Sequence, residues 1–198
     1  AGVNVISRAV ISTGSEVKAG IAGWETASAP TYAGTPSWGG SDDLEVITTT
    51  ASETAQNVSW TTPRYYAPGG ETTYMKAWSP AGTFSTDNTV SFANTDGSVD
   101  VLLAPVVSGS KTSKVSAPLA FKHMASQIKF SVKKGVGLAE GTKIASITIK
   151  NAQLPTGFDL KKGIDEDGVV TYAAAADLTV PNIDGSKEIS NAIAGDPV

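Results

Sequence analysis

Residues 118–133 carry the longest two-residue rhythm of apolar side chains in the chain, and this rhythm changes parity halfway. The apolar residues are first odd-numbered and then even-numbered: Leu119, Phe121, Ile128, Phe130 and Val132. A strand keeps such residues on one face only if an extra residue resets the register. We therefore expect a β-bulge near residues 123–127. A short helical turn is the alternative, disfavoured by the β-branched and aromatic residues of the second half and by the lack of a helix cap.

His123, the only histidine of the chain, lies within this stretch. If it alternates cleanly with Leu119 and Phe121, its imidazole points into an apolar layer, where backbone groups bind its ring nitrogens. We favour this core histidine over a general base or a metal ligand, because the chain has no second histidine and no cysteine to complete a site. The sequence therefore predicts no catalytic residue, no cofactor and no metal site.

The composition favours a soluble all-β protein. Of 198 residues, 40% are apolar and only 17% are charged, and Val and Ile recur in short alternating runs. The predicted strands have no helical period between them: 44–50, 72–82 with a stop at Pro80, 89–92, 100–105, 144–150 and 168–172. Asp96-Gly97 predicts a hairpin turn between 89–92 and 100–105. This spacing favours one sandwich or paired sandwiches.

The charges are distributed in blocks. The net charge of −4 argues against a nucleic-acid partner, which requires a basic surface. Residues 1–100 hold four basic and ten acidic side chains, residues 101–139 hold six lysines and no acid, and residues 140–198 hold five lysines and nine acids. Such blocks favour contact between acidic and basic segments, within one molecule or between copies. The lysines are equally typical of a solvated strand face.

The N-terminal segment, residues 1–13, is predicted to be an extended edge strand with one charge in its centre, Arg8. A basic residue there makes the Arg8–Ala9 bond a target for a trypsin-like protease. The alternative is a charge that protects the edge from aggregation. The sequence shows no signal peptide and no apolar run of the ~20 residues that cross a bilayer, so we expect a cytosolic, processed or trimmed chain.

All four tryptophans lie in the first 80 residues: Trp24, Trp38, Trp60 and Trp78. Exposed indoles serve as stacking platforms for sugars, and this gives a second functional hypothesis, a carbohydrate-binding surface module. Large aromatic residues of a β-sandwich lie more often in the core or under long loops. We favour the core.

Two motifs carry a family resemblance. The segment Leu119-Ala-Phe121-Lys-His123-Met-Ala-Ser126-Gln-Ile128-Lys-Phe130, preceded by Asp100-Val-Leu102-Leu-Ala104, resembles the fimbrillin family, the subunits of type V pili of anaerobic Gram-negative bacteria. The aromatic strand 74–80, which ends in Pro80, supports the resemblance, as do Trp38 and residues 43–46. The residues that match the core motif of the family are Asp100, Leu102, Ala104, Phe121, His123, Ser126 and Ile128.

The resemblance implies two tandem β-sandwiches, transthyretin-like or immunoglobulin-like. Residues 1–115 would form the first, with 1–13 as a removable strand, and residues 116–198 the second. The second is expected to be incomplete, because family members continue beyond the position of Val198. The resemblance also implies export through the outer membrane as a lipoprotein and polymerisation on the cell surface as a shaft or tip subunit. A role in adhesion to host or bacterial surfaces follows from it as well.

The resemblance further implies a mode of assembly. In the family, an arginine-specific protease removes the first strand, and a donor strand from the next subunit fills the groove that opens; the Arg8–Ala9 bond resembles that cleavage site. A missing strand leaves unpaired backbone and an apolar slot, and an added strand satisfies both. Such a heterologous contact propagates into a filament of pilin subunits. An enzyme ranks behind both this structural role and the carbohydrate-binding module.

Overall fold

The computed structural model describes residues 3–6, 11–132, 134–181, 183 and 185, so Arg8 and Ala9 lie outside the described residues. The described part contains fourteen strands, which pair antiparallel into four sheets, and no helix. This confirms the all-β sandwich class; the tandem arrangement stays a prediction. Within the same residues no helix could cross a membrane.

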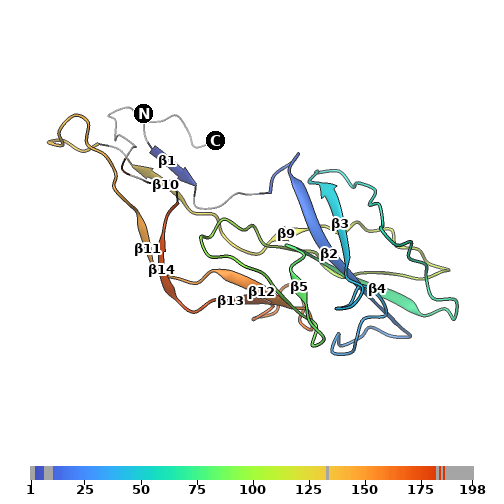
Figure 1. The fold of residues 1–198 in the computed structure, drawn as a ribbon. Coiled ribbons are helices and arrows are strands. Elements are labelled where there is room, and N and C mark those ends of the chain that lie inside the picture. Colours follow the sequence, from blue (N-terminus) through green and yellow to red (C-terminus); the bar gives the residue numbers. More distant parts are fainter. Residues whose placement is uncertain (1–2, 7–10, 133, 182, 184, 186–198) are drawn as a thin grey trace.

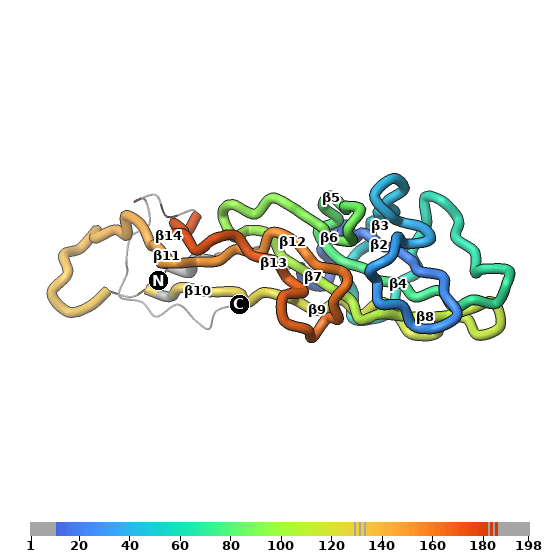
Figure 2. The backbone as a smooth tube through the Cα atoms, turned by 90° about the horizontal axis from the view of Figure 1, so that it is seen from below, coloured from blue at the N-terminus to red at the C-terminus, as the bar shows by residue number. Residues whose placement is uncertain are grey.

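The strands are distributed along an elongated molecule (Figures 1 and 2). The six-stranded sheet has the order β3 (Glu45–Thr50), β2 (Glu16–Thr26), β4 (Thr72–Ser79), β7 (Leu102–Leu103) and β9 (Lys122–His123), with β8 (Val107–Gly109) also paired to β4. The four-stranded sheet has the order β13 (Val170–Tyr172), β12 (Pro155–Asp159), β6 (Thr89–Ser91) and β5 (Thr83–Phe84). Two further sheets have two strands each: β1 (Val3–Ile6) with β10 (Lys129–Val132), and β11 (Thr148–Ala152) with β14 (Ala176–Thr179).

Strand β4 is the centre of the larger sheet. It pairs with β2 along one edge, from Gly20 opposite Trp78 to Thr26 opposite Thr72, and with β7 and β8 along the other. Its last four residues, 76–79, are all buried. Because successive side chains of a strand point to opposite faces, both faces of the sheet must be covered at this point.

One face packs against the four-stranded sheet and forms the sandwich core. Ala22, Trp24 and Trp78 of the larger sheet contact a set of apolar residues on the smaller one, which comprises Phe84, Val90, Phe158, Leu160, Val169 and Val170. The Trp78 indole N–H donates to the Ala81 carbonyl oxygen at 2.9 Å, so this fully buried ring leaves no unpaired donor.

The opposite face is covered by loops instead of a second sheet. Its buried residues alternate with those of the first face: Val17, Ala19, Ile21, Ile47, Ala77, Leu102 and Ala104. Trp38, Trp60, Val58, Leu119 and Phe121 pack on them from the connecting segments. Two glycines admit indoles close to the backbone: an ideal Cβ at Gly20 would lie 2.6 Å from the Trp78 ring, and one at Gly23 would lie 2.2 Å from the Trp38 ring.

The four-stranded sheet combines strands from both sides of residue 115. Gly157, Phe158 and Asp159 of β12 pair with Ser91, Val90 and Thr89 of β6. The expected boundary at 115/116 is therefore not a boundary between sheets, and the division of the chain into two domains stays a prediction.

The predicted bulged strand over 118–133 is two separate strands. β9 pairs with β7 in the six-stranded sheet, whereas β10 pairs with β1 in another sheet. The change of parity therefore marks a change of sheet, and neither a bulge nor a helical turn is needed. The predicted hairpin at Asp96-Gly97 is wrong for the same reason, because β6 and β7 belong to different sheets.

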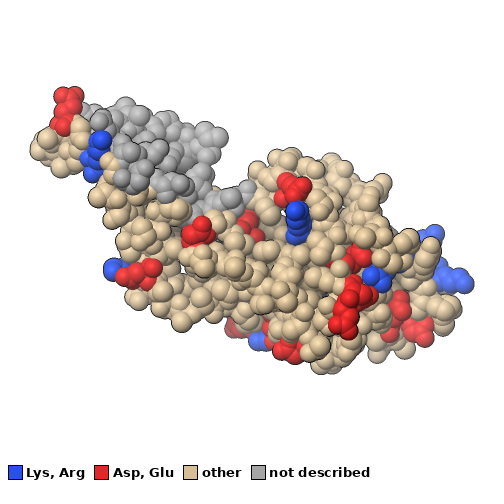
Figure 3. Space-filling view, in the orientation of Figure 1, with Lys and Arg blue, Asp and Glu red and all other residues tan. Residues whose placement is uncertain are grey.

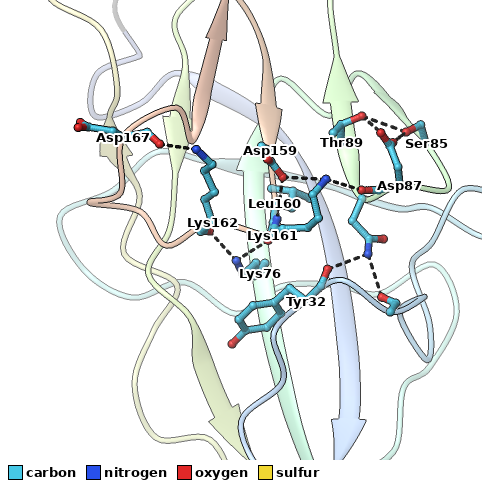
Figure 4. A network of polar contacts seen from close by, with 12 residues as sticks. Tyr32, Lys76, Ser85, Asp87, Thr89, Asp159, Leu160, Lys161, Lys162 and Asp167 are labelled. Atoms are coloured by element: carbon cyan, nitrogen blue, oxygen red, sulfur yellow. Dashed lines mark hydrogen bonds and ion pairs between the residues drawn. The ribbon is translucent and has the colours of Figure 1, made fainter.

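A network of polar contacts joins the two sheets of the sandwich (Figure 4). The Lys76 Nζ atom donates to the carbonyl oxygens of Leu160 at 2.5 Å and Lys162 at 2.8 Å, and lies 3.8 Å from the centre of the Tyr32 ring. The Asn88 side-chain amide donates to the Tyr32 and Gly34 carbonyl oxygens, each at 2.8 Å. These contacts fix the β12–β13 connection on strand β4.

The first prediction concerns the pH dependence of stability that Lys76 causes. Burial lowers the pKa of Lys76 to about 8, although Glu166 and Asp159 oppose the shift. The unfolded chain has an ordinary lysine pKa near 10.4, so it binds more protons than the folded chain between pH 8 and about 10. The free energy of unfolding of the native chain, minus that of Lys76→Met, should therefore rise with pH in this window. Denaturant titrations across this pH range measure the difference, and a difference that does not change with pH would contradict the prediction.

The second prediction concerns the close approach of β12 to β6. An ideal Cβ at Gly157 would lie 2.2 Å from the Val90 carbonyl oxygen, a backbone atom that cannot move away without breaking the ladder. Gly157→Ala should lower the free energy of unfolding by about 1–3 kcal/mol. Gly34→Ala is the matched control, because no atom lies within 4 Å of its Cβ position; it should change stability by less than about 0.5 kcal/mol. Equal effects of the two substitutions in chemical denaturation would contradict this packing.

Candidate functional site

The N-terminal strand β1 lies apart from the main sandwich. It pairs with β10, with Val3 opposite Val132 and Ile6 opposite Lys129, and no other described strand pairs with either of them. Figure 1 shows this pair at the narrow end of the molecule, beside β11 and β14. The edge of β10 that β1 covers is therefore a four-residue ladder.

This narrow end has a small core of its own. Val180 and Ile183 are buried there, with Phe130, Ile144, Ile147 and Ile149 packed against them. The two sheets over this core have two strands each among the described residues. Two-stranded sheets are marginally stable in water by themselves, and a third strand or a packed neighbour stabilises them.

A buried carboxylate holds the chain where it enters the main sandwich. The Ile11 backbone N–H donates to the Asp100 carboxylate at 2.8 Å, and the His123 Nδ1 atom lies 2.9 Å from the same carboxylate. The Asp100 side chain is 2% exposed. Asp100 thus connects three segments that are far apart in sequence: the start of the described chain after residue 10, the residues before β7, and strand β9.

The prediction that His123 lies in the core is wrong. The His123 side chain is 44% exposed, and its partner is the Asp100 carboxylate, not a backbone group. The reason is that β9 is an edge strand of two residues: His123 stays on the side of Leu119 and Phe121, but at this edge of the sheet that side is partly open to solvent. We find no group of three or more histidine, cysteine or carboxylate side chains able to hold a metal in the described part of the chain.

The loop-covered face of the six-stranded sheet contains a groove of about 660 Å³, here called the sheet groove. Its floor comprises side chains of the second core: Val17, Ile47, Met75 and Leu102. Its walls are the segments 49–58 and 115–121. The volume is in the range of pockets that enclose a compact ligand group.

Two polar groups lie in the wall and floor of the sheet groove. The Thr73 hydroxyl is buried, on a residue 3% exposed, and has no hydrogen-bond partner. The Arg64 guanidinium lies 5.3 Å from the Trp38 ring centre and 3.4 Å from the carboxylates of Asp43 and Glu45. Two carboxylates face one guanidinium here, so this side of the otherwise apolar groove carries a net negative charge.

The comparison with protein families was decisive. A model described as fimbrillin-like matches residues 8–193, which is nearly the whole chain. The chain belongs to the fimbrillin-like family. No match was found among the curated proteins or the solved structures. Fimbrillin-like proteins are structural subunits of cell-surface fimbriae, so the chain is a fimbrial subunit by family.

The motif residues of this fimbrillin-like chain divide into two groups. Leu102 and Ala104 are buried and Phe121 is half-buried, and all three pack in the second core, while Asp100 is buried beside them. His123, Ser126 and Ile128 are exposed. The first motif and the start of the second therefore belong to the sheet, whereas Ser126 and Ile128 lie where the chain leaves it toward β10.

Three of the four tryptophans of the fimbrillin-like chain are buried. Trp24, Trp38 and Trp78 are at most 7% exposed. Trp60 is half-buried and meets the Trp38 ring edge to face, with ring centres 5.7 Å apart. This agrees with the core position that we favoured.

Sequence analysis missed Lys76 and Glu45 as buried charges. The signal was present in the alternation: Lys76 shares a face with Tyr74 and Trp78, and Glu45 shares one with Ile47. The hydrogen bond from the Thr61 N–H to the Glu45 carboxylate at 2.7 Å comes from a loop whose course no local pattern predicts.

The third prediction tests the Asp100 anchor. Asp100→Ala removes the acceptor of the Ile11 N–H and the partner of His123, so it should lower the free energy of unfolding by about 1–3 kcal/mol. His123→Ala should cost less than about 1 kcal/mol, because its side chain is largely solvated. Chemical denaturation gives both values, and hydrogen exchange at the Ile11 amide should accelerate in Asp100→Ala. A larger effect of His123→Ala would contradict the assignment.

Proposed function

We infer that this fimbrillin-like chain polymerises by strand addition at the β10 edge, after its N-terminal strand has been removed. The observation that carries this proposal is the isolation of β1, which pairs with β10 and with no other described strand. Removing β1 leaves the sheets of the main sandwich with all their ladders.

Strand β10 needs a partner once β1 is gone. Its backbone N–H and C=O groups from 129 to 132 would lose their ladder, and unpaired groups of this kind favour pairing with another chain. Phe130 of β10 packs on the small core of the narrow end. An added strand would therefore restore hydrogen bonds and cover apolar surface together.

The Asp100 anchor supports a cut at Arg8–Ala9. Arg8 lies between β1 and Ile11 in sequence, and Ile11 is held to the main sandwich by Asp100. A cut after Arg8 would release β1 from the chain without loosening the residues that follow. An arginine-specific protease is accordingly the partner that we propose for activation.

The remaining features of the proposal rest on the family. We propose a subunit of the shaft or tip, exported through the outer membrane as a lipoprotein and incorporated into fimbriae that adhere to host or bacterial surfaces. The carbohydrate-binding alternative gains no support, because three of its four tryptophans are buried.

The fourth prediction uses the fact that the chain contains only two arginines, Arg8 and Arg64. Digestion with an arginine-specific protease should remove residues 1–8 and allow the chain to polymerise. Arg8→Lys should retain residues 1–8 and stay monomeric under the same digestion. Intact mass measures the cut, and electron microscopy with size-exclusion chromatography measures polymerisation.

Arg64→Lys is the matched control, with the same charge-conserving change at the other arginine. Arg64 is held by Asp43 and Glu45, so this variant should be cut at Arg8 and polymerise like the native chain. Polymerisation of the digested Arg8→Lys chain, or filaments whose subunits still contain residues 1–8, would refute activation by strand removal.

A further inference from the structure

The loop between β10 and β11 contains an exposed apolar turn, residues 135–138, here called the apolar tip. Val136 is fully exposed and Leu138 is 46% exposed, although both are large hydrophobic residues. The Leu138 N–H donates to the Gly135 carbonyl oxygen, and Gly137 has a φ of +93°, which favours glycine. The turn thus presents two apolar side chains and a backbone that its glycines leave uncovered.

The apolar tip and the sheet groove lie at opposite ends of the molecule. Figures 1 and 2 show the β10–β11 loop projecting at one end, whereas β3, β4 and β8, which contribute to the groove, lie toward the other. Within one elongated subunit the two do not meet. A contact between them therefore joins two copies head to tail, and such a heterologous contact extends a chain of subunits.

The two surfaces have complementary chemistry. The sheet groove offers apolar floor residues that can bury Val136 and Leu138.

The charges around the two surfaces are opposite in sign. Residues 129–143 contain four lysines and one glutamate. Four carboxylates line the groove or bind its lining residues, Asp43, Glu45, Glu53 and Asp100, against three cations in or beside its walls, Arg64, Lys114 and Lys122. Figure 3 shows acidic and basic side chains on the projecting loop and at the opposite end, with further charged side chains between them. Opposite charge on two docking surfaces fixes their orientation and speeds their encounter.

We propose that the apolar tip of one subunit inserts into the sheet groove of the next. The occupant of the groove is thus a second copy of this chain, with Val136 and Leu138 against the apolar floor. This proposal rests on the proposed function, because it requires subunits that follow one another along a fimbria. It differs from strand addition because it joins other surfaces and changes no ladder, and it is too weak to assemble filaments of the intact chain by itself.

The absence of cysteine from the sequence allows a direct test. Val136→Cys is placed in the tip, and Ala55→Cys is placed in the groove wall, where residue 55 is exposed and its side chain forms no hydrogen bond. The two intact variants are mixed in equal amounts under mild oxidation and analysed on non-reducing gels. The mixed disulfide dimer should form several-fold faster than either homodimer.

Two controls keep this test specific. Ala174→Cys, which is exposed on the connection between β13 and β14, should give no enrichment with either partner. Leu138→Asp, introduced into the Val136→Cys chain, should abolish the enrichment, and because Leu138 is largely exposed this variant should keep the native unfolding midpoint.

The outcomes separate this proposal from strand addition. Polymerisation after digestion without enrichment of the mixed dimer would overturn the tip contact and leave strand addition standing. Enrichment without polymerisation would support the tip contact alone. If the unlabelled Val136→Cys chain gives no mixed dimer, and a separate sample labelled at this cysteine with an environment-sensitive dye responds to phospholipid vesicles, the tip binds a lipid surface instead and the proposal falls.

Discussion

The fold depends on one strand, β4, that is buried on both faces and paired along both edges. Its alternate residues belong to different cores: Trp78 contacts the sandwich core, whereas Ala77 contacts the second core under the loops. Displacing this strand would expose both cores. Apolar burial on each of its two faces therefore contributes to holding β4 in the sheet. The polar network at Lys76 adds a third attachment, because it connects β4 to the loop after β12 through backbone carbonyl groups.

Local patterns in the sequence predicted the class of fold and many strands, but they missed β2, β5, β8, β12 and β14 and did not give the partners of the strands. The strands at 44–50 and 72–79 are where alternation places them, since alternation reports which residues share a face. The residues from 118 to 133 show its limit. The shift of the apolar residues from odd to even positions showed that the side chains change surroundings there. Only the pairings of β9 with β7 and of β10 with β1 show that the two halves belong to different sheets. His123 was misplaced for the same reason, because its partner Asp100 is 23 residues away.

The two ends of the molecule differ in how many strands cover their apolar cores. The main sandwich has a large core between two sheets of six and four strands, while the narrow end has two two-stranded sheets over a few apolar residues. We therefore expect the main sandwich to be the more stable part. The narrow end, where a partner strand is proposed to bind, should be the less stable part. The Asp100 carboxylate lies between these two parts, because it binds the Ile11 N–H where the chain enters the main sandwich. The location of this anchor could not be read from the sequence, in which Asp100 only precedes an apolar run.

The two glycines of β2 that face indole rings limit how this sequence can evolve. Gly20 lies against Trp78 on one side of the sheet and Gly23 lies against Trp38 on the other. Even a methyl group at either position would lift a ring off the backbone, and the two rings belong to different layers. Variation among homologous chains should therefore be free at most surface positions but coupled here, with each glycine exchanged only when the aromatic residue opposite it becomes smaller.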